Sequence, residues 1–178
     1  MITLTGTLKE RLDQAIRLSN REVSTEEIEH FRYIYDKAGI RLLPSAVEFY
    51  RQYGGVFRKH YLVLNKPEYN REVYLGFFAD YSNPKYKDPD REALSRLEDI
   101  MLDYDLARDY AKEEVCPVGE IGFYYPAEVF VGENGLLYCV YDFQDEIETF
   151  NNPAEILESY LKNLMPIGID FYPIKTHL

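Results

Sequence analysis

Residues 127–140 read Ala-Glu-Val-Phe-Val-Gly-Glu-Asn-Gly-Leu-Leu-Tyr-Cys-Val, and this stretch decides the class of the fold. Two short runs rich in β-branched and aromatic side chains lie on either side of Glu133-Asn-Gly135. Asn and Gly tolerate the positive φ angles that a tight turn between two strands requires. The stretch therefore predicts an antiparallel hairpin, with strands at 127–131 and 136–143.

Further strands are predicted on both sides of this hairpin. Residues 61–64, 73–78 and 115–123 form short runs that are β-branched or aromatic and are bounded by turn-forming residues. Residues 146–150 are a further strand candidate after the hairpin. We therefore expect several strands gathered in one sheet.

Helices are predicted before the strands. Apolar side chains recur at helical spacing over residues 8–16, and Ser24-Thr-Glu-Glu27 is a capping box that begins a second helix, which ends at Gly39. Pro44 begins a third helix, which we expect to end at the Gly54-Gly55 pair.

Two later helices complete the prediction. Asp90 is expected to cap a longer helix, and Asn152 a final one that begins with Pro153. The expected inner face of the longer helix consists of Leu94, Leu97, Met101 and Tyr104. Residues 166–178 are left unassigned. This order predicts an α+β fold of one domain over 1–178, with N-terminal helices, a mostly antiparallel sheet and a C-terminal helix packed on one side.

The charge of the chain is strongly one-sided. Of the formal net charge of -11, residues 113–178 carry -10, from 12 acidic and 2 basic side chains. The run from 113 to 161 contains eleven acids and no Lys or Arg. Because a surface of one sign attracts partners of the opposite sign, we expect a basic partner. Direct binding of nucleic acid is not expected, since phosphates need positive charge.

Composition predicts a folded protein of the cytoplasm. A hydrophobic content of 46%, with 17 Tyr and 10 Phe, is too high for a disordered chain. The opening residues lack a basic stretch followed by an apolar one, and no run approaches the roughly 18 apolar residues that cross a bilayer, so no membrane contact is expected. Cys116 and Cys139 have apolar flanks, which favours two buried free thiols over a disulfide.

The sequence patterns of enzymes are weak here. His30, His60 and His177 are scattered without a second ligand at metal spacing, and no Ser lies in a nucleophile turn or beside a plausible base. Two carboxylates within 142–148 could do acid–base work, as in a small acidic hydrolase, but a chain this acidic forms such pairs by chance. We therefore expect no enzyme, no cofactor and no metal.

Two groups of side chains are predicted to bind a partner. One is acidic, and the other consists of adjacent tyrosines between strands, where an exposed phenol ring gives a large contact area. The predicted partner-binding residues are Glu133, Asp142, Asp145, Glu146, Glu148, Tyr124 and Tyr125. The alternatives are a solvated acidic edge and tyrosines that fill the edge of the core. Tyr138 and Tyr141 point to opposite faces of their strand, so at most one lies on any single exposed surface.

Three segments of the chain, taken together and in order along the sequence, form a recognisable pattern. The first is Leu43-Pro-Ser-Ala-Val-Glu-Phe-Tyr-Arg-Gln-Tyr-Gly-Gly55, and the second is Val115-Cys-Pro-Val-Gly119. The third is Val129-Phe-Val-Gly-Glu-Asn-Gly-Leu-Leu-Tyr138, followed by an acidic strand and Phe150-Asn-Asn-Pro-Ala-Glu-Ile-Leu157. Together they resemble the SUKH superfamily, most of all its third branch, from about the second helix to the last.

The resemblance implies an α+β fold and a role as an antidote. Members of the superfamily are encoded beside polymorphic toxins, often nucleases, and neutralise them by binding, without shared catalytic residues. A nuclease domain tends to be basic because it holds phosphates, so resemblance and charge point to the same kind of partner. The alternative is an intracellular protein-binding regulatory scaffold, like the eukaryotic relatives, which include a yeast regulator of glucan synthesis. The oligomeric state stays open.

Overall fold

The structure is a computed structural model. It describes residues 5–7, 10, 14, 17, 23–66, 69–76, 88–122, 127–141, 147–163 and 169–173. The helix predicted over residues 8–16 falls largely outside these described residues, as does His177.

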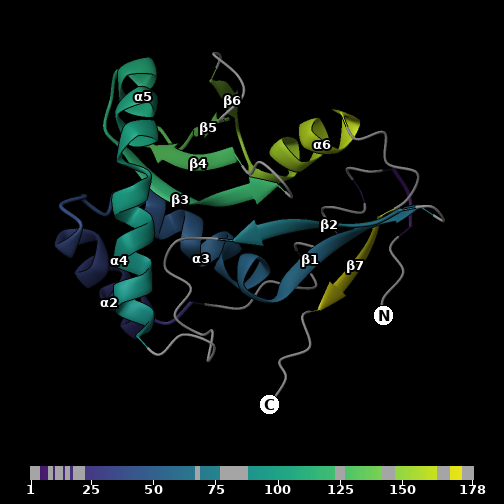
Figure 1. Cartoon of the computed structure of the whole chain (residues 1–178), viewed down its shortest axis with the longest axis horizontal. Coiled ribbons are helices and arrows are strands. Elements are labelled where there is room, and N and C mark those ends of the chain that lie inside the picture. The colour runs from purple at the N-terminus through teal and green to yellow at the C-terminus, as the bar shows by residue number, and fades with distance from the viewer. Residues whose placement is uncertain are drawn as a thin grey trace.

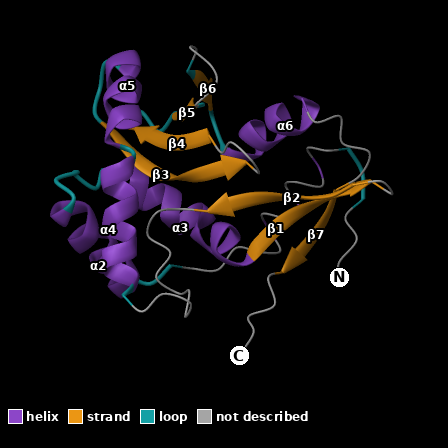
Figure 2. Ribbon diagram, in the orientation of Figure 1, coloured by secondary structure: helices purple, strands orange, loops and turns teal. Residues whose placement is uncertain are grey.

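Helices and a single sheet make up the described part of the chain (Figures 1 and 2). The elements are α2 (Thr25–Lys37), α3 (Pro44–Lys59), β1 (His60–Lys66), β2 (Tyr69–Gly76), α4 (Pro89–Asp99), α5 (Met101–Ala111), β3 (Val115–Gly122), β4 (Ala127–Gly132), β5 (Leu137–Val140), β6 (Glu148–Phe150), α6 (Pro153–Asn163) and β7 (Ile169–Pro173). The sheet order is β6-β5-β4-β3-β2-β1-β7, and every pair of neighbours is antiparallel. The predicted α+β class is confirmed.

Helices cover both faces of the sheet around β4. Val129 lies against Phe49 of α3 and Ile156 of α6, whereas the ring of the next residue, Phe130, lies 6.4 Å from that of Tyr104 on α5. Since neighbouring residues of a strand point to opposite faces, α5 covers one face, and α3 and α6 cover the other. Every residue of β5 is consequently buried, which is why its sequence lacks a polar and apolar alternation.

The predicted hairpin forms between β4 and β5. Gly135 adopts φ +82° in the turn, and the amide of Gly132 donates to the carbonyl of Leu136 at 2.9 Å. The side-chain oxygen of Asn134 accepts from the amide of Leu136 at 2.7 Å. Val131 pairs with Leu137, so the strands are in the expected antiparallel register. The second strand is shorter than predicted, because regular pairing ends at Val140.

The predicted starts of the second and third helices are correct. Ser24 accepts from the amide of Glu27 at 3.2 Å, and the Glu27 carboxylate accepts from the amide of Ser24 at 2.9 Å, which completes the capping box. The backbone of Gly39 is left-handed, with φ +74°, as the stop signal predicts. α3 begins at Pro44 but does not end at the Gly54-Gly55 pair, and its contacts with β1 to β4 explain how it continues to Lys59 despite two poor helix formers.

The helical segment before β3 differs from the prediction in its start and its continuity. Asp88, not Asp90, is the N-cap, since its carboxylate accepts from the amide of Arg91 at 3.2 Å. Pro89 then occupies the first turn. The helix is interrupted at Ile100, which separates α4 from α5.

The buried face of this helical segment also differs from the predicted one. Met101, which was expected inside, is 39% exposed. The buried residues are Ala93, Leu97, Ile100, Tyr104 and Ala107.

Two features of the sheet have no counterpart in the sequence prediction. The register of β3 against β4 shifts between Pro117 and Gly119, a bulge that accommodates a proline in an interior strand. β7, from the segment left unassigned, pairs with β1 and forms one edge of the sheet. A proline at position 173 suits an edge strand, because one side of such a strand donates no ladder hydrogen bonds.

Candidate protein-binding site

The structure locates only part of the predicted binding set. Tyr124, Tyr125, Asp142, Asp145 and Glu146 lie outside the described residues. Of the other two members, Glu133 is exposed in the β4–β5 turn, and Glu148 is half-buried on β6.

Glu133 and Glu148 do not lie together. Glu148 pairs with Cys139 in the sheet, whereas Glu133 precedes β5 in the turn, so about four residues, or roughly 13 Å of extended chain, separate them along the strand direction. The Glu148 carboxylate accepts from the hydroxyl of Tyr141 at 3.2 Å. Tyr138 and Tyr141 are both buried, so neither belongs to an exposed surface.

Glu133 instead joins two acids that follow α5. Its amide donates to the carbonyl of Glu114 at 3.2 Å, which fixes the hairpin turn beside residues 113 and 114. We call Glu113, Glu114 and Glu133 the acidic corner. The turn chemistry of residues 133–135 and the left-handed end of α5 at Lys112, with φ +55°, bring these three acids together.

Phenol groups hold two carboxylates of the acidic corner, those of Glu113 and Glu114, in place. The hydroxyl of Tyr138 donates to Glu113 Oε1 at 3.1 Å and accepts from the side-chain amide of Asn134 at 3.2 Å. The hydroxyl of Tyr104 donates to Glu114 Oε2 at 3.3 Å. Because phenols are neutral, these bonds orient the carboxylates and leave their negative charge in place.

Burial and the neighbouring carboxylates both raise the pKa values of Tyr104 and Tyr138. Burial raises the pKa of Tyr138, and its hydrogen bond to Glu113 adds to that increase. Burial likewise raises the pKa of Tyr104, with the Glu114 charge as the second cause. Both phenols therefore stay protonated, and remain donors, throughout the neutral range.

α5 extends the acidic corner with two exposed aspartates that the sequence prediction missed. Asp105 and Asp109 lie on α5, and Asp105 forms an ion pair with Arg108 at 2.9 Å. A break in composition could have found them: residues 88–178 contain 20 acidic and 6 basic side chains, whereas residues 1–87 contain 11 and 14. The boundary at residue 113, where the run without Lys and Arg begins, leaves these two aspartates in the nearly neutral first part of the chain.

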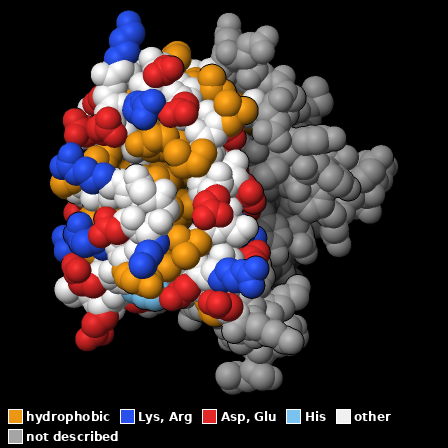
Figure 3. Space-filling view, turned by 60° about the vertical axis from the view of Figure 1, so that its left-hand side comes forward, with side chains coloured by type: hydrophobic (Ala, Val, Ile, Leu, Met, Phe, Trp, Pro, Cys, Tyr) orange, Lys and Arg blue, Asp and Glu red, His pale blue; other side chains and the backbone are white. Residues whose placement is uncertain are grey.

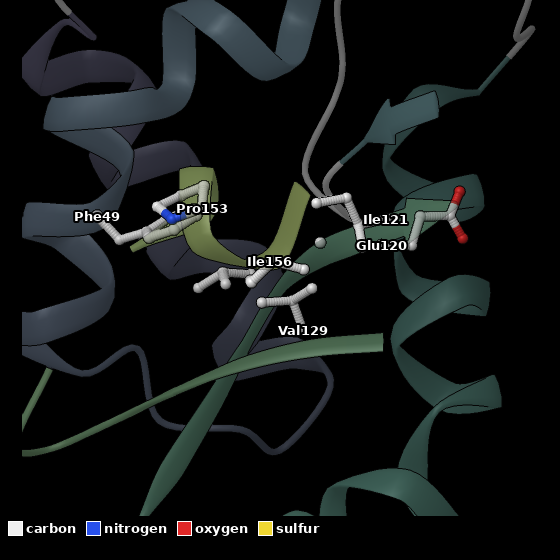
Figure 4. Close-up of a pocket in the computed structure, with 8 residues that line it drawn as sticks. Phe49, Glu120, Ile121, Val129, Pro153 and Ile156 are labelled. Carbon is white, nitrogen blue, oxygen red and sulfur yellow. The ribbon is translucent and has the colours of Figure 1, made fainter. Parts of the chain in front are cut away.

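A small cavity lies between α3, α6 and the sheet (Figure 4). Its lining is apolar apart from one acid, Glu120, whose carboxylate points away from Phe49 and Ile156 in Figure 4 and pairs with Arg96 at 3.6 Å. Its volume of about 10 Å³ is at the lower limit for one water molecule. This cavity therefore lacks both the size and the second carboxylate that a small acidic hydrolase needs.

Metal-ligating and nucleophilic groups give no further site in the part of the chain that the structure describes. There, no group of three or more His, Cys, Asp and Glu is arranged to hold a metal ion. Cys116 and Cys139 are buried free thiols, as predicted, and burial raises the pKa of Cys116 to about 12. Among the described helices, none combines the length and apolar character needed to cross a bilayer.

Comparisons with protein-family models, with curated proteins and with solved structures find no significant match to this chain.

Proposed function

We propose that this chain is a cytoplasmic, non-enzymatic immunity protein that binds and neutralises a basic toxin domain, a nuclease, through its acidic surface. The observation that carries the proposal is the acidic corner with Asp109 beside it. Glu114, Glu133 and Asp109 are exposed, and the only hydrogen bonds that the described residues make to the carboxylates of Glu113 and Glu114 come from neutral phenols.

Such a surface suits recognition of a basic protein. The carboxylates of Glu113 and Glu114, which phenols hold in place, lose little side-chain freedom on binding, so their charge acts at defined positions. A basic nuclease active site presents the opposite sign, and an acidic inhibitor can occupy the place of the phosphates. The resemblance to SUKH immunity proteins and the two free thiols, which fit a reducing compartment, support the same role.

The test is co-expression in bacteria with the C-terminal domain encoded by the gene immediately upstream. The proposal expects growth rescue, co-purification of the two proteins, and association that approaches roughly 10⁸ M⁻¹s⁻¹ at low ionic strength and slows as salt rises. A neighbouring product that lacks a toxic domain, or a toxic domain that is neither bound nor neutralised, contradicts it.

Charge variants identify which acids steer the partner. The double variant Asp109→Asn/Glu133→Gln should lower the association rate at low salt by about tenfold. The matched control, Glu26→Gln/Asp36→Asn on α2, removes the same charge from other exposed positions and should bind at the wild-type rate.

A third variant, Asp142→Asn/Asp145→Asn/Glu146→Gln, tests the acids that the sequence favoured. A larger loss of rate in this variant than in the double variant would move the interface to residues 142–146. Equal rates in all variants across a salt series would contradict electrostatic recognition.

A further inference from the structure

α5 carries a row of exposed apolar side chains beside the acidic corner. Leu102, Leu106 and Tyr110 are 74%, 49% and 54% exposed. They recur every four residues, so they lie one above the other on one side of the helix. We call these three residues the α5 stripe. In Figure 3, where the side of the molecule with α4 and α5 comes forward, hydrophobic side chains form patches between acidic and basic ones.

Aspartates border the α5 stripe on both sides. At 100° per residue, Asp105 and Asp109 lie on one side of the row through Leu106, and Asp103 lies on the other. Arg108, the one base within α5, lies beyond Asp105 on the helix and forms an ion pair with it at 2.9 Å. On α5 itself, the side chains next to the α5 stripe are therefore acidic.

The α5 stripe is also continuous with the acidic corner. The ring of Tyr110 meets that of Tyr138 edge to face, with 6.2 Å between centroids, and the Tyr138 hydroxyl donates to Glu113. Glu113 Oε1 in turn lies against Gly132, where an added Cβ would come within 2.2 Å of it. A partner that lands on the α5 stripe would thus meet the corner carboxylates in the same footprint.

Charge selects the occupant of this surface. A second copy of the chain would bring two acidic borders together, and like charges across an interface oppose association. A basic protein surface with an apolar centre complements both the row and its border. Leucine and tyrosine side chains at the centre of an interface are desolvated, while charges at the rim set the rate of encounter.

We propose that the α5 stripe is the anchoring part of the interface, and that it packs into an apolar depression ringed by Lys and Arg on the toxin domain. This inference rests on the proposed function and adds a division of labour to it. The aspartates and the acidic corner speed capture, and Leu102, Leu106 and Tyr110 slow release.

The experiment measures binding kinetics with the toxin domain encoded by the upstream gene. The variant Leu102→Ser/Leu106→Ser should raise Kd at least about tenfold, through faster dissociation, while the association rate and its salt dependence stay unchanged. The matched control is Tyr33→Ser on α2, which removes a side chain of similar exposure, 50%, away from the α5 stripe and should bind like the wild type. All replaced side chains are exposed, so unchanged thermal unfolding verifies the fold of each variant.

The outcomes separate the two proposals. If the wild type does not bind the toxin domain, the proposed function fails, and the anchoring role fails with it. If the wild type binds and the leucine variant binds equally well, the function stands and the anchoring role alone is overturned. The same holds if the leucine variant differs from the wild type only in sedimentation, because the stripe would then join two copies of this chain.

Discussion

The phenol oxygens of Tyr35 and Tyr50 lie 2.5 Å apart, and the Tyr35 hydroxyl donates to the carbonyl of Pro117 at 2.5 Å. Both side chains are fully buried. The two bonds tie α2, α3 and β3 together beside the bulge in β3. Since Tyr35 donates to Pro117, its oxygen accepts from Tyr50, so the two hydroxyls have different roles.

Replacing either hydroxyl should therefore cost a different amount of stability. Tyr35→Phe removes the shared partner of Tyr50 and of the Pro117 carbonyl, so we expect a loss of about 2–3 kcal/mol in the free energy of unfolding. Tyr50→Phe removes a single donor and should cost about 1 kcal/mol. Urea unfolding with an unchanged m-value measures both. Equal losses would mean that the Tyr35 hydroxyl does not join the two groups.

Replacement by Ala and by Asn should lower stability at both glycines of the hairpin, but in opposite order. An added Cβ at Gly132 would lie 2.2 Å from Glu113 Oε1 and 2.9 Å from the Tyr138 ring, so Gly132→Ala should cost about 1–3 kcal/mol, and Gly132→Asn more. At Gly135 nothing lies within 4 Å, and the cost comes from φ +82° alone. Gly135→Ala should cost about 1 kcal/mol, and Gly135→Asn less, because Asn tolerates left-handed backbone.

The thermal or urea midpoints of these four variants check the prediction. The decisive comparison is the order of Ala and Asn at each position. If Asn is better than Ala at both glycines, the crowding of Gly132 by Glu113 and Tyr138 is wrong.

The parts of the fold that the sequence predicts well are those in which neighbouring residues determine the structure. The Ser24 capping box and the 133–135 turn are specified by side chains within three residues of the backbone groups that they satisfy. The interruption at Ile100 has no such signal, because residues 98–102 contain neither Pro nor Gly. The Gly54-Gly55 pair gives a local stop signal that the packing of α3 on the sheet outweighs.

The candidate site was predictable only in part for the same reason. The charge bias and Glu133 are visible in the sequence. The association of Glu133 with Glu113 and Glu114 depends on where the hairpin turn meets the end of α5, which is a contact between segments about twenty residues apart. The exposure of Leu102 and Leu106 likewise depends on which side of α5 packs on the sheet. The sequence alone shows only that both side chains are apolar.

The two buried thiols should be unreactive in the native protein. Burial raises the pKa of Cys116 to about 12 and raises the pKa of Cys139 as well, and the thiolate is the nucleophile. We expect neither to react with a disulfide reagent such as DTNB at pH 8 without denaturant, and both to react in urea. Fast labelling of the native protein would contradict their burial.

The raised thiol pKa values also predict how stability changes in alkali. The unfolded chain loses its thiol protons near pH 9, while the folded chain keeps that of Cys116 until about pH 12. Because the folded state then binds more protons, the free energy of unfolding should fall as the pH rises from about 9 towards 12. The variant Cys116→Ala/Cys139→Ala should lose most of this slope between pH 9 and 10, where the tyrosines of the unfolded chain, with an ordinary pKa of 10.0, still keep most of their protons. An identical slope in both proteins would contradict the assignment.

The start of α4 offers a direct test between two neighbouring acids. Asp88 accepts from the amide of Arg91, so Asp88→Ala should cost about 1 kcal/mol, and Asp88→Ser, which keeps an acceptor, much less. Asp90 lies in the first turn and contacts His30 Nε2 at 3.2 Å on the surface, so Asp90→Ala loses only a favourable interaction with the helix dipole and a weak surface contact. We expect its cost to stay below about 0.5 kcal/mol. Urea unfolding at pH 7 compares the variants, and a larger loss for Asp90→Ala than for Asp88→Ala would restore Asp90 as the cap.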